Sequence, residues 1–325
     1  MPESYGTKDK EYALKIFIFG WYGQGNLGDE IFKISFRQLW SNFDLTFGNE
    51  IPSNINTAYD ALWVGGGSFL DQPIKGIESV TIPIKFIGVG ICSNLPSSNR
   101  KALERADLIV CRDSNSFGYI KEKAILASDL AFARNDLQPL NLPQTKQITV
   151  ILNDFLTPVG GSVPDWRSLS YYWFLQEFSK ILDRFVSAEG YRIKLLPLCI
   201  NPRFDDRRIA AAVQGRSSYP QKYAWVLEAT TEAILRQEIS KSAFVITQRF
   251  HGLVYSIIEH RPCIALCTHD KFNSLAKDFS IPSLDYYGVT DSKFEVVLKQ
   301  VLEATPNYGA YIDAAKKVWN SIALK

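Results

Sequence analysis

The segment TQRFHG, residues 247–252, combines side chains that suit work on an anion. It follows the apolar run FVI and leads into LVYSIIEH, the pattern of a helix that begins directly after a strand. Such a helix start presents free N–H groups and a positive dipole end, and both favour an anion. Arg249 adds a permanent charge, His251 can donate a proton near neutral pH, and Gly252 follows it. The segment predicts an anion site with an acid–base group; the alternatives are a hydrogen-bonded His251 beside a helix cap and an Arg249 that braces the turn.

A second cationic side chain, Lys271, follows the next apolar run, CIALC, in the segment CTHDKFNSLAKDF. Because neighbouring parallel strands end at the same edge of a sheet, the two loops are expected to be neighbours. The chain has three histidines, and a tri-histidine metal site would need all of them. His260 belongs to the turn EHRP after a helical run, so a metal site is not expected.

Acidic and amide side chains gather in a glycine-rich turn, WYGQGNLGDE at residues 21–30, after the strand-like IFIFG. Its G-x-G-x-x-G pattern, which ends at Gly28, is that of a dinucleotide-binding turn. However, Asp29 and Glu30 follow directly and would repel a pyrophosphate, so a dinucleotide is not expected. These acids suit either helix capping or hydrogen bonds to sugar hydroxyls, and Asn26, which both donates and accepts, complements the second role.

Further polar turns follow strand-like runs, where ligands of open α/β sheets bind. They contain Gly66 and Gly67 in GGGSFLD, Arg112 in CRDSNS, and Asp205 with Asp206 after LLPLCINPRF. Arg112 suits a contact with a ligand in the cleft, but helix capping by Asp113 explains its turn equally well. One of the two acids at 205–206 is expected to cap the next helix.

Alternating strand and helix patterns must position these turns. In residues 1–134 strands are expected at 15–19, 44–47, 61–64, 85–89, 108–111 and 124–127. Residues 135–147, with two prolines and no periodicity, are expected to be a linker. The block 148–325 has strands in ITVIL, RIKLLPL, AFVITQ and CIALC and closing helices at 292–304 and 309–323. The prediction is an α/β fold of two Rossmann-like domains whose parallel sheets face a cleft, with the last helix a candidate to pack on the first domain.

The composition restricts the class of protein. The chain has 325 residues, 46% of them hydrophobic, which is enough for two cores. The net charge of +2 gives no broad basic field, so nucleic acid is not an expected partner. The five cysteines show no CxxC spacing and are expected to be buried free thiols. Since no apolar stretch reaches the roughly 18 residues that span a bilayer, a cytoplasmic protein is expected, with peripheral association at the inner face of the membrane as an option.

Five motifs together resemble the polysaccharide pyruvyl transferase family, in the family's order and over nearly the whole chain. They are GQGNLGDE, GGGSFLD, RDSNSFGYI followed by SDLAF at 128–132, RFHGLVYSIIEHRPCIAL and HDKFNSLAKDF. The GN-x-GDE and R-x-H elements are the most specific. The late element departs from the family pattern, because His269 stands where a tyrosine is common.

The resemblance implies a glycosyltransferase-B-like fold and transfer of a pyruvyl group from phosphoenolpyruvate to two sugar hydroxyls. The product is a cyclic ketal on a cell-surface glycan or its precursor, phosphate is released, and no cofactor is required beyond this co-substrate. It implies that His251 protonates the methylene carbon of the donor and that Asp29 activates a hydroxyl. The donor side would comprise Arg249, Lys271, Gly252 and Arg112, and the acceptor side Asn26, Gly28, Glu30, Gly66, Gly67 and Asp205. Two rival functions are a nucleotide-sugar-dependent glycosyltransferase of the same fold and a non-catalytic partner in glycan assembly.

Overall fold

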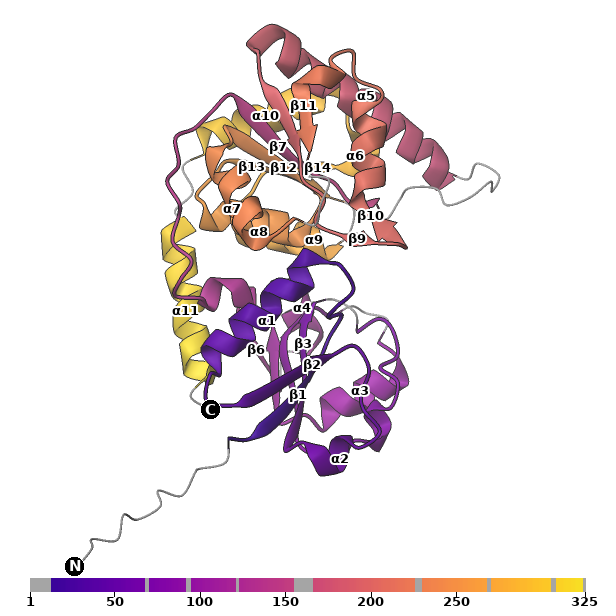
Figure 1. The fold of residues 1–325 in the computed structure, drawn as a ribbon, viewed down its shortest axis with the longest axis vertical. Helices are drawn as coiled ribbons and strands as arrows, with labels where there is room; N and C mark the ends of the chain where they lie inside the picture. Colours follow the sequence, from indigo (N-terminus) through magenta and orange to yellow (C-terminus); the bar gives the residue numbers. More distant parts are fainter. Residues whose placement is uncertain are drawn as a thin grey trace, which may run out of the picture.

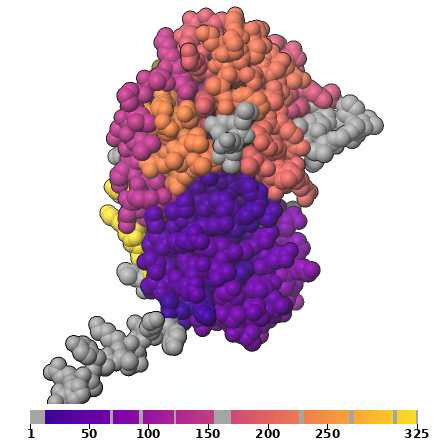
Figure 2. Space-filling model, viewed as in Figure 1, coloured from indigo at the N-terminus to yellow at the C-terminus, as the bar shows by residue number. Residues whose placement is uncertain are grey.

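A computed structural model describes residues 13–67, 70–91, 95–120, 123–154, 166–225, 230–267, 270–304 and 308–323, with only the backbone at 166–168 and 270–271. The chain forms two stacked lobes, each built around a parallel sheet (Figure 1). The space-filling view shows the N-terminal lobe, in indigo and purple, in direct contact with the C-terminal lobe above it (Figure 2).

The N-terminal lobe contains a six-stranded sheet in the order β2-β1-β3-β4-β5-β6. All of its pairs are parallel. The strands are β1 Lys15–Phe19, β2 Asp44–Gly48, β3 Ala61–Gly67, β4 Ile84–Val89, β5 Leu108–Cys111 and β6 Ala124–Leu126. The central strand β3, ALWVGGG, is buried along its whole length, as expected where helices cover both faces of a sheet.

The C-terminal lobe repeats this plan with the order β11-β8-β7-β12-β13-β14, again all parallel. Its strands are β7 Gln147–Ile151, β8 Arg192–Leu195, β11 Tyr223–Trp225, β12 Phe244–Thr247, β13 Cys263–Cys267 and β14 Ser283–Asp285. A short antiparallel pair, β9 Ile200–Asn201 and β10 Phe204–Asp205, projects from this lobe toward the other.

Helices connect the strands of both sheets. They are α1 Leu27–Leu39, α2 Ile55–Ala58, α3 Ser97–Glu104, α4 Ser114–Tyr119, α5 Trp166–Glu189, α6 Asp206–Gln214, α7 Glu232–Lys241, α8 Phe250–Ile258, α9 Asp270–Asp278, α10 Asp291–Glu303 and α11 Tyr308–Ala323, with the 3-10 turn η3 at Leu130–Ala133. This α/β architecture confirms the predicted fold class. The three-residue edge strands β11 and β14 were not predicted, because so short a segment carries no readable alternation.

In each sheet the chain first adds strands on one side of its first strand and then crosses to add the rest on the other side. This topological switch point lies between β1 and β3 in the first sheet and between β7 and β12 in the second. Ligands of open α/β sheets bind in the crevice at such a switch point, beyond the carboxyl ends of the strands. The turn after β1 leads into α1, and the turn after β12 leads into α8. In Figure 1 the start of α1 and the helices α8 and α9 lie where the lobes meet, so the two switch points face each other.

The last helix, α11, joins the two lobes. Tyr308 at its start belongs to a buried cluster of the C-terminal lobe with Leu253 of α8, whereas Trp319 lies in the core of the N-terminal lobe with Ile18 and Val110. The indole Nε1 of Trp319 donates a hydrogen bond to the Ser128 carbonyl over 3.2 Å. In Figure 1 the yellow helix runs down the side of the lower lobe.

Replacing Trp319 with alanine is expected to destabilise the N-terminal lobe. The side chain is 0% exposed, so its loss leaves a cavity that costs roughly 3–5 kcal/mol. The free energy of unfolding, measured with urea, checks this. Asn320→Ala, at the exposed next position of the same helix, serves as the control, and equal stability of the two variants would contradict the docking of α11.

Candidate functional site

The glycine-rich turn after β1 is hydrogen-bonded to the opposite lobe. The N–H of Leu27 donates to the Leu198 carbonyl over 2.8 Å, and the N–H of Ile200 donates to the Gly25 carbonyl over 2.9 Å. These bonds form an antiparallel bridge between the turn and the segment that leads into β9. The turn is therefore fixed at the boundary between the lobes.

Gly28 of this turn lies directly against His251 of α8. A Cβ atom added at Gly28 would lie 2.2 Å from His251 Nδ1, far inside contact distance. The ring of Phe32, one turn further along α1, packs edge-on against the imidazole with 5.0 Å between the ring centroids. His251 is 7% exposed. The structure thus joins the predicted acceptor turn and the predicted acid in one contact.

The other side of the imidazole faces a carboxylate. His251 Nε2 lies 3.8 Å from Oδ1 of Asp129, a fully buried residue that caps η3 by accepting a hydrogen bond from the Ala131 N–H. Asp129 was not predicted as a site residue, although it lies in the SDLAF segment just after β6. Its position beyond the carboxyl end of a strand was the available signal.

Burial controls the protonation of His251. It lowers the pKa of the imidazole to about 4; Asp129 acts in the opposite direction and Arg112 in the same one. The imidazole is therefore neutral at pH 7. An anion bound beside it would favour the protonated form and raise this pKa.

Asp29 is shifted in the opposite direction. Its carboxyl is buried, and this raises its pKa to about 7, although Arg112 and a hydrogen bond from Asn26 act to lower it. That bond joins Asn26 Nδ2 to Asp29 Oδ2 over 2.5 Å. Since Asp29 titrates near neutral pH, it can take up or release a proton under physiological conditions.

Helix α1 is capped by Asn26, whose Oδ1 accepts the N–H of Gly28 over 3.3 Å. Glu30 instead accepts the N–H of Gly23 over 2.6 Å and pairs with Lys33. The interpretation of Asp29 or Glu30 as the cap was therefore wrong. Asn26 fills that position because its β-region backbone places the amide oxygen over the first turn.

Arg112 brings a buried positive charge to the meeting of the two turns. Its guanidinium lies 3.9 Å from the centre of the Phe250 ring, at the start of α8. Burial lowers its pKa, and the carboxylates of Asp129, Asp113 and Asp29 oppose this shift. The guanidinium of Arg112 therefore lies at the lobe boundary. The turn that carries it is also a helix cap, because Asp113 caps α4.

Arg249 braces the segment that bridges the lobes. Its Nε donates to Asp206 Oδ2 over 2.9 Å, and a second nitrogen bonds Oδ1. The same carboxylate accepts the N–H groups of Leu198 and Cys199. Of the two roles considered for Arg249, an anion contact and a brace for the turn, the structure shows the brace.

The remaining predicted residues surround this centre. Gly66, in a left-handed conformation, lets Phe32 pack closely, because an added Cβ would lie 2.4 Å from the ring; Gly67 ends β3. Gly252 packs against Thr247 in the same way. Asp205 caps α6 and pairs with Arg207, which confirms the predicted cap. The side chain of Lys271, in the first turn of α9, lies outside the described residues.

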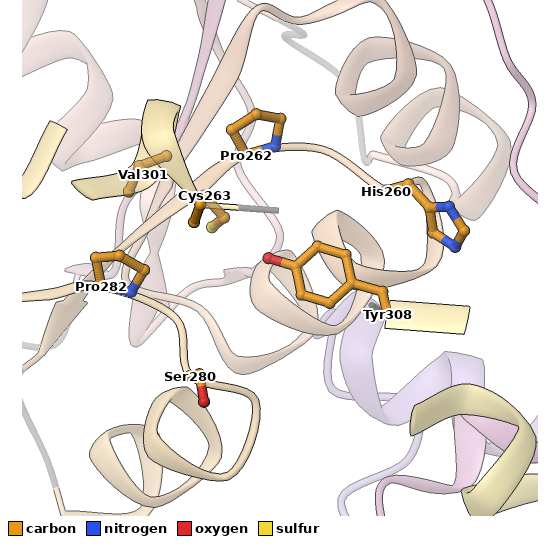
Figure 3. Close-up of a pocket in the computed structure, with 8 residues that line it drawn as sticks. His260, Pro262, Cys263, Ser280, Pro282, Val301 and Tyr308 are labelled. Carbon is orange, nitrogen blue, oxygen red and sulfur yellow. The ribbon is translucent and has the colours of Figure 1, made fainter. Parts of the chain in front are cut away.

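A separate cavity of about 140 Å³ lies at the other end of α8 (Figure 3). It is lined by His260, Pro262, Cys263, Ser280, Pro282, Val301, Ala304 and Tyr308. These residues lie at the amino ends of β13 and β14, at the carboxyl end of α10 and at the start of α11, at the edge of the sheet away from His251. The cavity belongs to the attachment of α11.

Two bulk expectations can be compared with the described residues. Cys111, Cys199, Cys263 and Cys267 are free and buried, as predicted, and Cys92 lies outside the described part of the chain. Within the described part, none of the helices is both long and apolar enough to cross a membrane.

Comparisons with known proteins agree with this architecture. A family model for polysaccharide pyruvyl transferase matches residues 7–270, while no curated protein matches the chain by sequence. The fold is similar to that of UDP-GlcNAc 2-epimerase from Methanocaldococcus jannaschii, with a TM-score of 0.61 and 8% identity over 96% of this chain and 100% of that chain. A putative UDP-N-acetylglucosamine 2-epimerase from Listeria monocytogenes has a TM-score of 0.60 and 10% identity over 96% of this chain and 95% of that one.

The glycotransferase of kitacinnamycin has a TM-score of 0.55 and 8% identity, over 96% of both chains. At such low identities the likeness shows the fold alone. It confirms the glycosyltransferase-B-like arrangement of the two lobes.

Replacing Gly28 with alanine is expected to force the lobes apart at the site. The added methyl group would overlap His251 and destabilise this state by roughly 1–3 kcal/mol. Thermal unfolding and small-angle scattering would show a lower midpoint and a larger radius. Gly118→Ala is the control, because a Cβ there meets no atom within 4 Å. If Gly28→Ala matches that control, the contact is not tight in solution.

Asp29 and His251 are expected to give folding stability opposite pH dependences. The raised pKa of Asp29, about 7 against 3.8, contributes stability at low pH that is lost as the pH rises toward 7. The lowered pKa of His251, about 4 against 6.5, contributes stability above pH 6.5 that is lost as the pH falls toward 4. Asp29→Asn removes the contribution that falls with pH, so the unfolding free energy should rise more steeply between about pH 4 and pH 6.5. His251→Asn removes the contribution that rises with pH, so the unfolding free energy should fall with pH over the same range.

Urea unfolding at several pH values tests this pair, with the exposed Asp44→Asn as a control that should keep the wild-type slope. Wild-type slopes in both site variants would show that neither group is shifted.

Proposed function

Because the chain belongs to the polysaccharide pyruvyl transferase family, we propose that it transfers a pyruvyl group from phosphoenolpyruvate to two hydroxyls of a sugar. The acceptor belongs to a cell-surface glycan or its precursor, and the products are a cyclic ketal and phosphate. The observation that carries this proposal is the contact between His251 at the start of α8 and the Gly28–Asp29 turn at the start of α1.

The donor binds on the α8 side of this contact. The free N–H groups at the start of α8 and the buried guanidinium of Arg112 attract the phosphate and carboxylate groups of phosphoenolpyruvate. Lys271 at the start of α9 adds a second cation. Because bound anions raise the pKa of a neighbouring imidazole, His251 takes up its proton when the donor is present.

The acceptor binds on the α1 side. Asp29 is held by Asn26 and titrates near neutral pH, so it can accept a proton from a sugar hydroxyl. Since His251 and the Asp29 turn belong to different lobes and are in contact, substrates enter by separating the lobes at this contact.

The reaction follows in balanced steps. His251 gives a proton to the methylene carbon, and the first hydroxyl attacks C2 while its proton passes to Asp29. The bond from C2 to the phosphate oxygen then breaks, and phosphate leaves with the electron pair. The second hydroxyl attacks C2 and closes the ring, and its proton leaves with the phosphate. Asp29 returns its proton to His251 through solvent.

Mass spectrometry of candidate glycans incubated with phosphoenolpyruvate tests this function directly. A mass increase of a pyruvyl ketal with release of one phosphate per ketal supports the proposal. Calorimetric binding of a UDP-sugar, without binding of phosphoenolpyruvate, would instead identify a nucleotide-sugar-dependent enzyme and overturn it.

His251→Asn is expected to reduce phosphate release from phosphoenolpyruvate with acceptor by about 100-fold or more, because general acid catalysis of that size is lost. His260→Asn is the matched control. That histidine lies at the far end of α8, is exposed, and has a φ of 52°, which asparagine adopts readily. Equal activity of the two variants would remove His251 from the chemistry.

A further inference from the structure

A buried imidazole and a buried carboxylate from different lobes lie close together at the site without a hydrogen bond between them. Among the described residues, neither His251 Nε2 nor Asp129 Oδ2 has a partner. His251 Nε2 is 3.8 Å from the other carboxylate oxygen of Asp129. Because a buried polar group without a partner is unfavourable, a closer approach that brought Nε2 and the Asp129 carboxylate from 3.8 Å to hydrogen-bond distance would be favourable.

We propose that Asp129 is the positioning residue of His251: from the opposite lobe it binds the Nε2–H and thereby directs Nδ1 toward the Gly28 turn, where the substrates meet. This inference rests on the proposed function, in which His251 is the general acid. It identifies Nδ1 as the nitrogen that delivers the proton.

The surroundings of His251 favour Asp129 over the other carboxylates. The charged groups that act on the imidazole are Asp129, which caps η3, Arg112 from the turn after β5 and Glu232 from α7. Glu232 already accepts hydrogen bonds from Arg134 over 2.7 Å and from Tyr255 over 2.6 Å. The carboxylate of Asp29 accepts a hydrogen bond from Asn26. Asp129 alone of these carboxylates combines an unpaired oxygen with proximity to Nε2.

The geometry also divides the work between the two nitrogens. A proton on Nε2 stays with Asp129 throughout the reaction, so the ring keeps one orientation and one tautomer. When the donor is protonated, the Nδ1–H bond breaks, a C–H bond forms at the methylene carbon, and the neutral imidazole retains its Nε2 proton. Because Asp129 and His251 belong to different lobes, the pair exists only when the lobes are in contact.

Nitrogen-15 NMR of the imidazoles tests the pairing without any substrate, since the chain has three histidines and His251→Asn assigns the signal. The wild-type chain should show the Nε2–H tautomer of His251 at neutral pH. Asp129→Asn should mix the two tautomers and lower the titration midpoint, because the carboxylate that favours the charged ring is gone. Asp113→Asn, at another buried cap of the same lobe, should leave both unchanged. If Asp129→Asn does not fold, Asp129→Ser keeps a capping oxygen without the charge.

Kinetics give a second measurement. An acid must be protonated to act, so the activity falls as the pH rises through its pKa. In Asp129→Asn this alkaline limb should move to lower pH and kcat should fall about tenfold, with the KM for phosphoenolpyruvate within about twofold; Asp129→Glu should restore part of kcat. Wild-type tautomer, midpoint and pH limb in Asp129→Asn would overturn the proposal. An altered tautomer in a chain that never consumes phosphoenolpyruvate would uphold the pairing and refute the proposed function alone.

Discussion

The contact between Gly28 and His251 is the constraint on which the site depends. No other residue fits at position 28 while the imidazole is in place, and the neighbouring features keep the two together. Phe32 supports the ring from α1, and Gly66 gives Phe32 its space. The ion pair of Arg249 and Asp206 supports the segment to which the turn is hydrogen-bonded.

The same burial gives the site two titratable groups with opposite shifts. It disfavours the charged form of each, so the pKa of a carboxyl rises and that of an imidazole falls. The pKa values of Asp29 and His251 thereby exchange their usual order. Arg112 lowers both pKa values, because its charge stabilises the carboxylate of Asp29 and the neutral form of His251.

Much of this was readable in the sequence. Apolar runs that end in glycine gave the strands, and the turns after β1 and β12 gave Asn26, Asp29 and His251, because parallel sheets gather such turns at one edge. The packing partners were not readable. Asp129 became a neighbour of His251 only through the docking of η3 under α8. The pairing of Arg249 with Asp206 likewise depends on two loops of the same lobe that lie 43 positions apart.

The route of the chain between the lobes has a mechanical consequence. The segment before β7 and the helix α11 both cross the boundary, and Figure 1 shows both on the same side, away from β9 and β10. Two covalent connections on the same side form a hinge. They allow the lobes to rotate about that edge and oppose a sliding or twisting of one lobe against the other. Rotation about this edge would separate His251 from Gly28, and its reversal would return them to the same register.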